Sequence, residues 1–199
     1  MSANVHKTPL GLVLCGGMST RMGSDKGLLR GADGRLWALA LTELLEQYVS
    51  DVCISIRPEQ ASAYRTHFPD ECLIQDRPIA AGPMRGLLSA YERFPERDLL
   101  VVACDQQLLD QSILSMLMQS YAEQTRAPAL AFFDSHGWQP LCAIYRASFF
   151  VELKSKPVSL DKAGHSLRRL LSIVPAFPIE IPSQLETSLR GFNSPLTIE

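Results

Sequence analysis

The chain has 199 residues, 46% of them hydrophobic, which is enough to build one sizeable core and predicts a single domain over residues 1–199. The 19 basic and 21 acidic residues give a formal net charge of −2. No global charge therefore draws the protein to nucleic acid or to an acidic membrane surface, and any anion site has to be local.

The cysteines and the first residues indicate the compartment. The five cysteines are widely spaced, form no C-x-x-C pair and lie mostly in apolar runs, so we expect them to be reduced and largely buried. Residues 1–9 lack the apolar stretch of a signal peptide, and no later run approaches the ~20 apolar residues that cross a bilayer. These features predict a cytoplasmic protein without membrane contact.

Short apolar runs alternate with longer segments of helical period along the whole chain. Strands are expected at 10–14, 52–56, 72–74, 99–103, 129–133, 141–145 and 177–181. Helices are expected over 36–49, 84–94, 110–121 and, as two short helices, within 148–175. The alternation predicts βαβ units and therefore an α/β fold with a mainly parallel central sheet and helices on both faces.

A glycine-rich loop follows the first expected strand. Gly16 and Gly17 can bring backbone N–H groups close to an anion, and glycine permits the positive φ angles of an anion-binding nest. Arg21 and Lys26 lie in the same loop and could neutralise charge on a departing pyrophosphate. The spacing matches neither G-x-x-x-x-G-K-[ST] nor G-x-G-x-x-G, which disfavours a kinase or a dehydrogenase. A tight turn beside two surface cations is the alternative.

A carboxylate follows the apolar strand expected at 99–103. Asp105 would lie at the carboxyl end of that strand, where open α/β sheets bind their ligands, and an oxygen ligand there suits Mg²⁺. The four histidines are isolated in sequence, so zinc is not indicated. An aspartate at a strand end more often caps a turn, and only its partnership with the first loop favours a metal role.

Residues 76–86 form a second loop that leads into a helix starting near Pro83. This loop could cover a base or a ribose, although an ordinary connection fits the sequence equally well. No G-x-S-x-G elbow or other covalent motif is present. The mechanism that these features indicate is direct in-line attack by a phosphorylated acceptor.

The first loop carries a resemblance to a known family. Residues 14–26 read L-C-G-G-M-S-T-R-M-G-S-D-K and resemble the signature L-A-G-G-x-S-x-R-M-G-x-D-K of the molybdenum cofactor guanylyltransferases, the MobA-type nucleotidyltransferases, with Cys15 in place of the usual Ala. The resemblance continues with Asp76, with G-P-M-R-G at 82–86 for G-P-L-A-G, and with Cys104-Asp105 for the metal-binding C-D.

The C-terminal half resembles the same family more loosely. Gln139-Pro140-Leu141 resembles H-P-L, residues 164–171 resemble a G-x-x-S-L helix, and F-N-S-P at 192–195 resembles part of F-x-N-x-N-T-P. The resemblance covers nearly the whole chain. It implies a single-domain, Rossmann-like nucleotidyltransferase fold, with the nucleotide bound by the N-terminal half and the acceptor by the C-terminal half.

The resemblance also implies ligands and site residues. The reaction would be Mg²⁺-dependent transfer of GMP from GTP to molybdopterin with release of pyrophosphate, and molybdoenzyme maturation proteins would be further partners. Arg21, Lys26 and Asp105 would be catalytic, and Asp105 would hold the metal ion. The residues implied in nucleotide binding are Leu14, Cys15, Gly16, Gly17, Arg21, Lys26, Arg57, Asp76, Gly82 and Asp105, and those facing molybdopterin are Gln139, Pro140 and Asn193.

Three departures from the family pattern leave alternatives open. Gln106-Gln107 stands where the family has a residue followed by Pro, Gly191 replaces the first Asn of N-x-N, and Arg57 stands where Asn is frequent. A cytidylyltransferase for the same cofactor more often reads L-A-A-G, so Gly16 favours guanine. A sugar-phosphate nucleotidyltransferase, and a catalytically degenerate protein that binds and delivers a nucleotide or cofactor, are the other interpretations.

Overall fold

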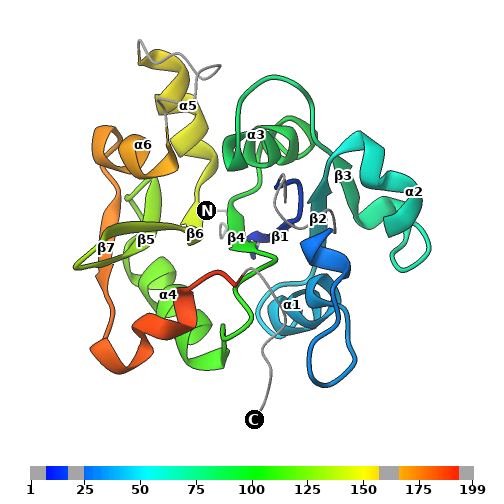
Figure 1. The fold of residues 1–199 in the computed structure, drawn as a ribbon. Helices are drawn as coiled ribbons and strands as arrows, with labels where there is room; N and C mark the ends of the chain where they lie inside the picture. The colour runs from blue at the N-terminus through cyan, green and yellow to red at the C-terminus, as the bar shows by residue number, and fades with distance from the viewer. Residues whose placement is uncertain (1–7, 18–24, 157–165, 193–199) are drawn as a thin grey trace.

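The structure, a computed structural model, describes residues 8–17, 25–156 and 166–192. These residues form one seven-stranded sheet between two layers of helices (Figure 1). The predicted α/β fold with helices on both faces of the sheet is confirmed.

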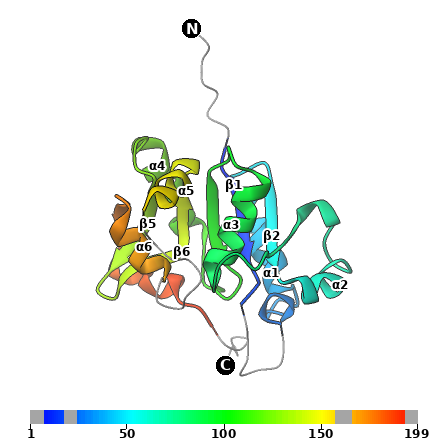
Figure 2. The ribbon, with the colours of Figure 1, turned by 90° about the horizontal axis from the view of Figure 1, so that it is seen from above.

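The sheet is mainly parallel. Its strands are β1 (Leu10–Leu14), β2 (Val52–Ile56), β3 (Leu73–Gln75), β4 (Leu99–Ala103), β5 (Ala129–Asp134), β6 (Gly137–Tyr145) and β7 (Phe177–Glu180). Their order is β3-β2-β1-β4-β6-β5-β7, and only β6 runs antiparallel to its neighbours. Figure 2, seen from above, shows β5 and β6 on one side of the molecule and β1 and β2 on the other.

The helices connect these strands. They are α1 (Trp37–Leu45), α2 (Ala61–Tyr64), α3 (Pro83–Arg93), α4 (Gln111–Glu123), α5 (Ala147–Ser155) and α6 (Leu167–Ile173). Short 3₁₀ helices occupy Lys26–Leu28, Pro58–Gln60, Asp70–Cys72 and Ser183–Leu189. Asp110 caps α4 as predicted, since its carboxylate accepts hydrogen bonds from the backbone N–H groups of Ser112 and Ile113.

Alternate side chains of the central strands face two separate cores. On one face, Val13 packs in a cluster with residues of α1, α2 and α4, and on the other, Leu12 packs with residues of α3, α5 and α6. Every residue of β1 and β4 is buried. Because each fully buried Leu or Val stabilises a fold by roughly 1.5–3 kcal/mol, these two strands form a rigid base for the loops that follow them.

Two differences from the predicted elements have physical reasons. β6 begins at Gly137, four residues before the predicted start, and continues through Pro140. The register with β5 shifts there, with Ala131 opposite Ala143 but Phe132 opposite Gln139, and such an irregularity tolerates a residue that lacks an N–H donor. Sequence reasoning also missed α2, whose four residues are too few for a periodic signal.

The cysteines agree with the expectation from sequence, whereas α1 ends at Leu45, four residues before the predicted end at Val49. All five cysteines are free, four of them are buried, and Cys72 is half-buried. Within the described residues, no helix is long and apolar enough to cross a membrane.

Candidate active site

A pocket lies at the edge of the sheet where β1, β2, β3 and β4 end. These four strands are parallel, so their carboxyl ends and the loops after them meet there. The pocket measures about 480 Å³, which is within the range of small-molecule sites. It is lined by Leu14, Cys15, Gly16, Gly17, Lys26, Ser55, Arg57, Asp76, Ala81, Gly82, Pro83, Arg85, Gly86, Ala103, Cys104, Asp105 and Leu141.

Most of the residues predicted to bind the nucleotide line this pocket. They are Leu14, Cys15, Gly16, Gly17, Lys26, Arg57, Asp76, Gly82 and Asp105. Arg21 and Asn193 lie outside the described residues. The structure thus brings together loops that are far apart in the sequence, as the parallel topology requires.

Lys26 and Asp105 meet at the β1–β4 end of the pocket. The Lys26 Nζ lies 2.8 Å from the Asp105 Oδ2, and the two side chains are 19% and 24% exposed. An ion pair this accessible to water contributes about 0–1 kcal/mol to stability. An entering phosphate could therefore replace the carboxylate as the partner of the ammonium at little cost.

Asp25 fixes the loop that carries Lys26. Its carboxylate caps the 3₁₀ helix Lys26–Leu28 by accepting from the Gly27 N–H at 3.0 Å. It also accepts from the Tyr64 hydroxyl at 2.9 Å and from the Gln60 Nε2. Through these contacts, Asp25 holds the loop in place.

Asp76 and Ser55 occupy the β2–β3 end of the pocket. Asp76 is 6% exposed and accepts a 2.5 Å hydrogen bond from the Ser55 hydroxyl. Burial raises the pKa of Asp76 to about 6, against the opposing effects of the Ser55 hydrogen bond and of the Arg85 and Arg57 charges. Burial in this site therefore disfavours the ionised form of the Asp76 carboxyl group.

The reason for glycine at position 16 differs from the one expected. Among the described residues, positive φ occurs only at Gly34, Gly82 and Gly137, so the expectation of positive φ at Gly16 and Gly17 is wrong. At Gly16, a side chain would collide with the Asp76 carboxylate. The glycine is needed because the backbone and the carboxylate approach each other closely.

Arg57 contacts the backbone of the glycine loop. Its Nη1 donates to the carbonyl oxygens of Gly17 at 2.6 Å and Gly16 at 3.3 Å, and its Nε pairs with Glu59 at 2.8 Å. Arg57, which stands where the family often has Asn, thus connects the glycine loop to the end of β2 by hydrogen bonds. Arg57 also lines the pocket, and its contact with the nucleotide stays a prediction.

The second loop leads into α3 as predicted. Gly82, with φ of +58°, precedes the helix and Pro83 is its first residue. Arg85 also lines the pocket and donates from its Nε to the Ala80 carbonyl oxygen at 3.0 Å.

Sequence reasoning missed Ser55 and Arg85 as pocket residues. Ser55 is the one hydroxyl-bearing residue of β2, so a hydroxyl within an otherwise apolar strand was the available signal. Arg85 stands where the family signature has Ala, and that departure could have singled it out.

Two of the three residues predicted to face the acceptor, Gln139 and Pro140, lie on β6. Gln139 donates to the Asp134 carboxylate at 2.7 Å, and the Pro140 carbonyl accepts from the Tyr145 hydroxyl at 2.8 Å. Neither lines the pocket, whereas the next residue, Leu141, does. The pocket wall therefore reaches β6 one residue beyond the predicted pair.

The donor set of the pocket fits a magnesium ion better than a zinc ion. No group of three or more His, Cys, Asp or Glu side chains suited to a metal occurs in the described parts of the chain. A metal ion at Asp105 would need most of its ligands from phosphate oxygens and water. Mg²⁺ is commonly bound in this way, through one or two carboxylates and the phosphates of a substrate.

Comparison with known proteins places the chain in a family. The MobA-like NTP transferase domain matches residues 11–176, which include all of β1 except Leu10, the glycine loop and Asp105. The chain belongs to the MobA-like NTP transferases. It is therefore a nucleotidyltransferase, which confirms the family and the class of reaction inferred from the first loop.

Individual MobA-like relatives support this assignment. The chain is 33% identical over 144 residues to a molybdenum cofactor biosynthesis bifunctional protein of Synechocystis sp., and the match covers 72% of this chain but only 41% of that longer protein. It is 33% identical over 138 residues to a probable molybdenum cofactor guanylyltransferase of Methanothermobacter thermautotrophicus, covering 68% of this chain and 70% of the relative.

A solved structure shows the same MobA-like fold. Molybdopterin-guanine dinucleotide biosynthesis protein A from Archaeoglobus fulgidus superposes with a TM-score of 0.71 at 22% identity, covering 94% of this chain and 93% of that one. The predicted Rossmann-like nucleotidyltransferase fold is confirmed.

Proposed function

We propose that the chain transfers GMP from GTP to molybdopterin with Mg²⁺ and releases pyrophosphate, forming molybdopterin guanine dinucleotide. The observation that carries the proposal is the convergence of the glycine loop, Lys26 and Asp105 in one pocket of a MobA-like NTP transferase. The relatives named as molybdenum cofactor guanylyltransferases give the reason to choose this donor and this acceptor.

The pocket supports a defined direction for the nucleotide. Neighbouring strands are about 4.8 Å apart, so the loops after β3 and β4 lie roughly 14 Å from each other along the sheet edge. We place the triphosphate over the β1–β4 end, near Gly16, Gly17 and Lys26, and the nucleoside over the β2–β3 end, near Asp76 and Gly82. In this arrangement, Lys26 and the predicted contribution of Arg21 lie beside the leaving pyrophosphate.

The chemistry is an in-line displacement. An oxygen of the acceptor phosphate attacks the α-phosphorus of GTP, the bond from that phosphorus to the bridging oxygen breaks, and pyrophosphate leaves with the electron pair. Lys26 neutralises charge on the departing group, and the backbone of the glycine loop orients the phosphates. Asp105 would hold a magnesium ion, which when bound shields the charge of the phosphates.

The acceptor half and the cellular setting extend the same proposal. Gln139, Pro140 and Asn193 contribute to the molybdopterin side, next to the pocket wall at Leu141. The protein works in the cytoplasm and passes its product to molybdoenzyme maturation proteins. The small-molecule partners are GTP and molybdopterin.

Calorimetry tests the nucleotide half of the proposal. GTP, CTP, ATP and UTP are titrated in the presence of Mg²⁺ into the native chain, into Asp105→Ala and into Asp70→Ala. Asp70 is the control because its side chain is 68% exposed and does not line the pocket. We expect binding selective for GTP that weakens in Asp105→Ala and persists in Asp70→Ala. Preference for CTP would indicate the cytidylyltransferase alternative, and absence of any selective binding would contradict the proposal.

The acceptor is tested by turnover. Molybdopterin and GTP are incubated with the native chain, and the dinucleotide and pyrophosphate are measured. Formation of both in equal amounts supports the transferase. GTP-selective binding without product from molybdopterin would favour either a sugar-phosphate acceptor or a degenerate binding protein, and a screen of sugar phosphates separates these two.

A further inference from the structure

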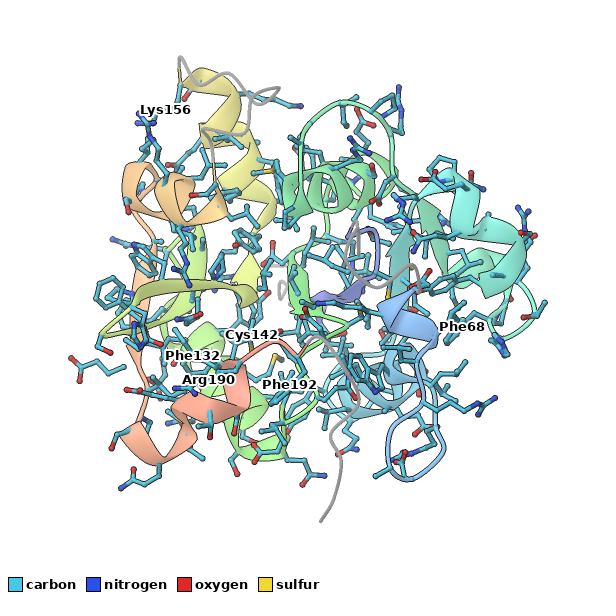
Figure 3. The ribbon with its side chains drawn as sticks, viewed as in Figure 1. Phe68, Phe132, Cys142, Lys156, Arg190 and Phe192 are labelled. Carbon is cyan, nitrogen blue, oxygen red and sulfur yellow. The ribbon has the colours of Figure 1, made fainter. Side chains whose placement is uncertain are left out.

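The C-terminal segment 188–192 lies against the loop that carries Asp105. In Figure 1 this red segment runs from the last 3₁₀ helix toward the end of β4, and Figure 3 labels Arg190 and Phe192, which flank Gly191. The Phe192 N–H donates to the backbone carbonyl oxygen of Asp105 at 2.9 Å. Two segments far apart in the sequence are therefore held together at the pocket.

Gln106 ties the two segments by its side chain. It is 4% exposed, its Oε1 accepts from the Ala103 N–H at 3.0 Å, and its Nε2 donates to the Leu189 carbonyl oxygen at 3.1 Å. Both ends of the amide are thus used, one on the last residue of β4 and one on the C-terminal segment. This contact gives a structural reason for a glutamine directly after the family's C-D pair.

Gly191 leaves room for the Asp105 carboxylate. A Cβ atom at position 191 would lie 2.9 Å from the Asp105 Oδ1 and 3.0 Å from its Cγ and Oδ2. Gly191 is not among the glycines with positive φ, so its backbone does not require glycine. The requirement is for space, because real side chains do not approach a carboxylate this closely.

The carboxylate is consequently held between two contacts. Lys26 holds Oδ2 at 2.8 Å, and the backbone of Gly191 packs against the same group. Asp105 is only half-buried, so solvent would otherwise allow its side chain to rotate. The hydrogen bond from Gln106 to the Leu189 carbonyl oxygen sets the distance between the C-terminal segment and the Asp105 carboxylate.

We propose that Gly191 and Gln106 are positioning residues that fix the orientation of the Asp105 carboxylate toward the bound metal ion and triphosphate. The inference rests on the proposed function, because it assigns a purpose to the orientation of Asp105. It also explains one departure from the family pattern: the side chain lost at Gly191 leaves room for the Asp105 carboxylate beside the contact that Gln106 makes between β4 and the C-terminal segment.

Three variants perturb the contact by different means. Gly191→Ala and Gly191→Asn introduce the Cβ that meets the carboxylate. Gln106→Glu keeps the size of the side chain but places an oxygen against the Leu189 carbonyl in place of a donor. Gln107→Glu is the matched control, because its Nε2 bonds to the Cys104 carbonyl within the same loop and not to the C-terminal segment.

Binding of Mn²⁺, followed by electron paramagnetic resonance with a non-reacting α,β-methylene analogue of GTP, reports the role. Gly191→Ala, Gly191→Asn and Gln106→Glu should each weaken Mn²⁺ binding at least tenfold, and Asp105→Asn should show the same loss. Binding of the analogue in EDTA and the thermal unfolding midpoint should change little in the three variants. Gln107→Glu should bind Mn²⁺ within twofold of the native chain. Native Mn²⁺ affinity in the Gly191 variants, or equal losses with and without metal, would overturn the proposal.

A crystal structure of Gly191→Ala gives a second readout that does not depend on the nucleotide. We expect the Asp105 carboxylate to have turned so that the 2.8 Å contact with the Lys26 Nζ is broken, with β4 unchanged. An unmoved carboxylate would overturn the positioning role. If the native chain binds no triphosphate at all, the proposed function fails, whereas this structural result still decides whether Gly191 orients Asp105.

Discussion

Replacing Asp76 with asparagine should stabilise the protein at neutral pH. The side chains are nearly isosteric, and the amide oxygen can still accept the hydrogen bond from Ser55. Burial raises the pKa of Asp76 from an ordinary value of 3.8 to about 6. That difference corresponds to about 3 kcal/mol by which the ionised carboxylate destabilises the folded chain well above pH 6.

The sign and the pH range follow from the raised pKa. The unfolded chain loses the Asp76 proton near pH 4 and the folded chain near pH 6, so the contribution of this group to stability is present below about pH 4 and is lost as the pH rises through 6. The amide in the Asp76→Asn variant cannot ionise. The stability of that variant relative to the native chain should therefore increase by about 3 kcal/mol between pH 3 and pH 8, with roughly half of the increase reached by pH 5.

Urea unfolding of both chains between pH 3 and pH 8, followed by the fluorescence of the buried Trp37, measures this difference. Other titrating groups are common to both chains and cancel. Arg57, Arg85 and Glu59 also act on Asp76, and their net effect is already contained in the raised pKa. A stability difference that does not change with pH, or one that favours the native chain more at pH 8, would refute this reasoning. Asp70→Asn, at an exposed position, is the control.

Three further changes test other parts of the site. Lys26→Met should lower the rate of pyrophosphate release about 100-fold. It should change the free energy of unfolding by less than about 1 kcal/mol, because the ion pair of Lys26 with Asp105 is partly exposed. A variant with native turnover would contradict the role of the lysine. Gly16→Ala should both lower the thermal unfolding midpoint and weaken GTP binding, since the added methyl group collides with Asp76. An unaltered midpoint would show that the glycine loop moves to accommodate the methyl group without loss of stability. Ser55→Ala should raise the pKa of Asp76 above about 6, because it removes the donor that favours the ionised form. NMR titration of the Asp76 carboxyl group measures this shift. A pKa equal to or below that of the native chain would exclude the Ser55 hydrogen bond as a stabiliser of the carboxylate.

The sequence alone determined most of the strands and helices and the residues of the glycine loop. The expected strands at 10–14, 52–56 and 99–103 match β1, β2 and β4 residue for residue, because fully buried strands produce continuous apolar runs. The composition of the glycine loop and the carboxylate after β4 also sufficed to place Gly16, Lys26 and Asp105 in one site. In a parallel sheet, the carboxyl ends of the strands necessarily share an edge.

Only the tertiary structure decided which groups touch. The insertion of antiparallel β6 between β4 and β5, the approach of Asp76 to Gly16, and the tie from Gln106 to Leu189 join residues far apart in the chain. Periodicity and local spacing carry no information about such pairs, because both reflect the nearest turns of the backbone. Strand order and close packing fix these contacts, and with them the reasons for Gly16, Gln106 and Gly191.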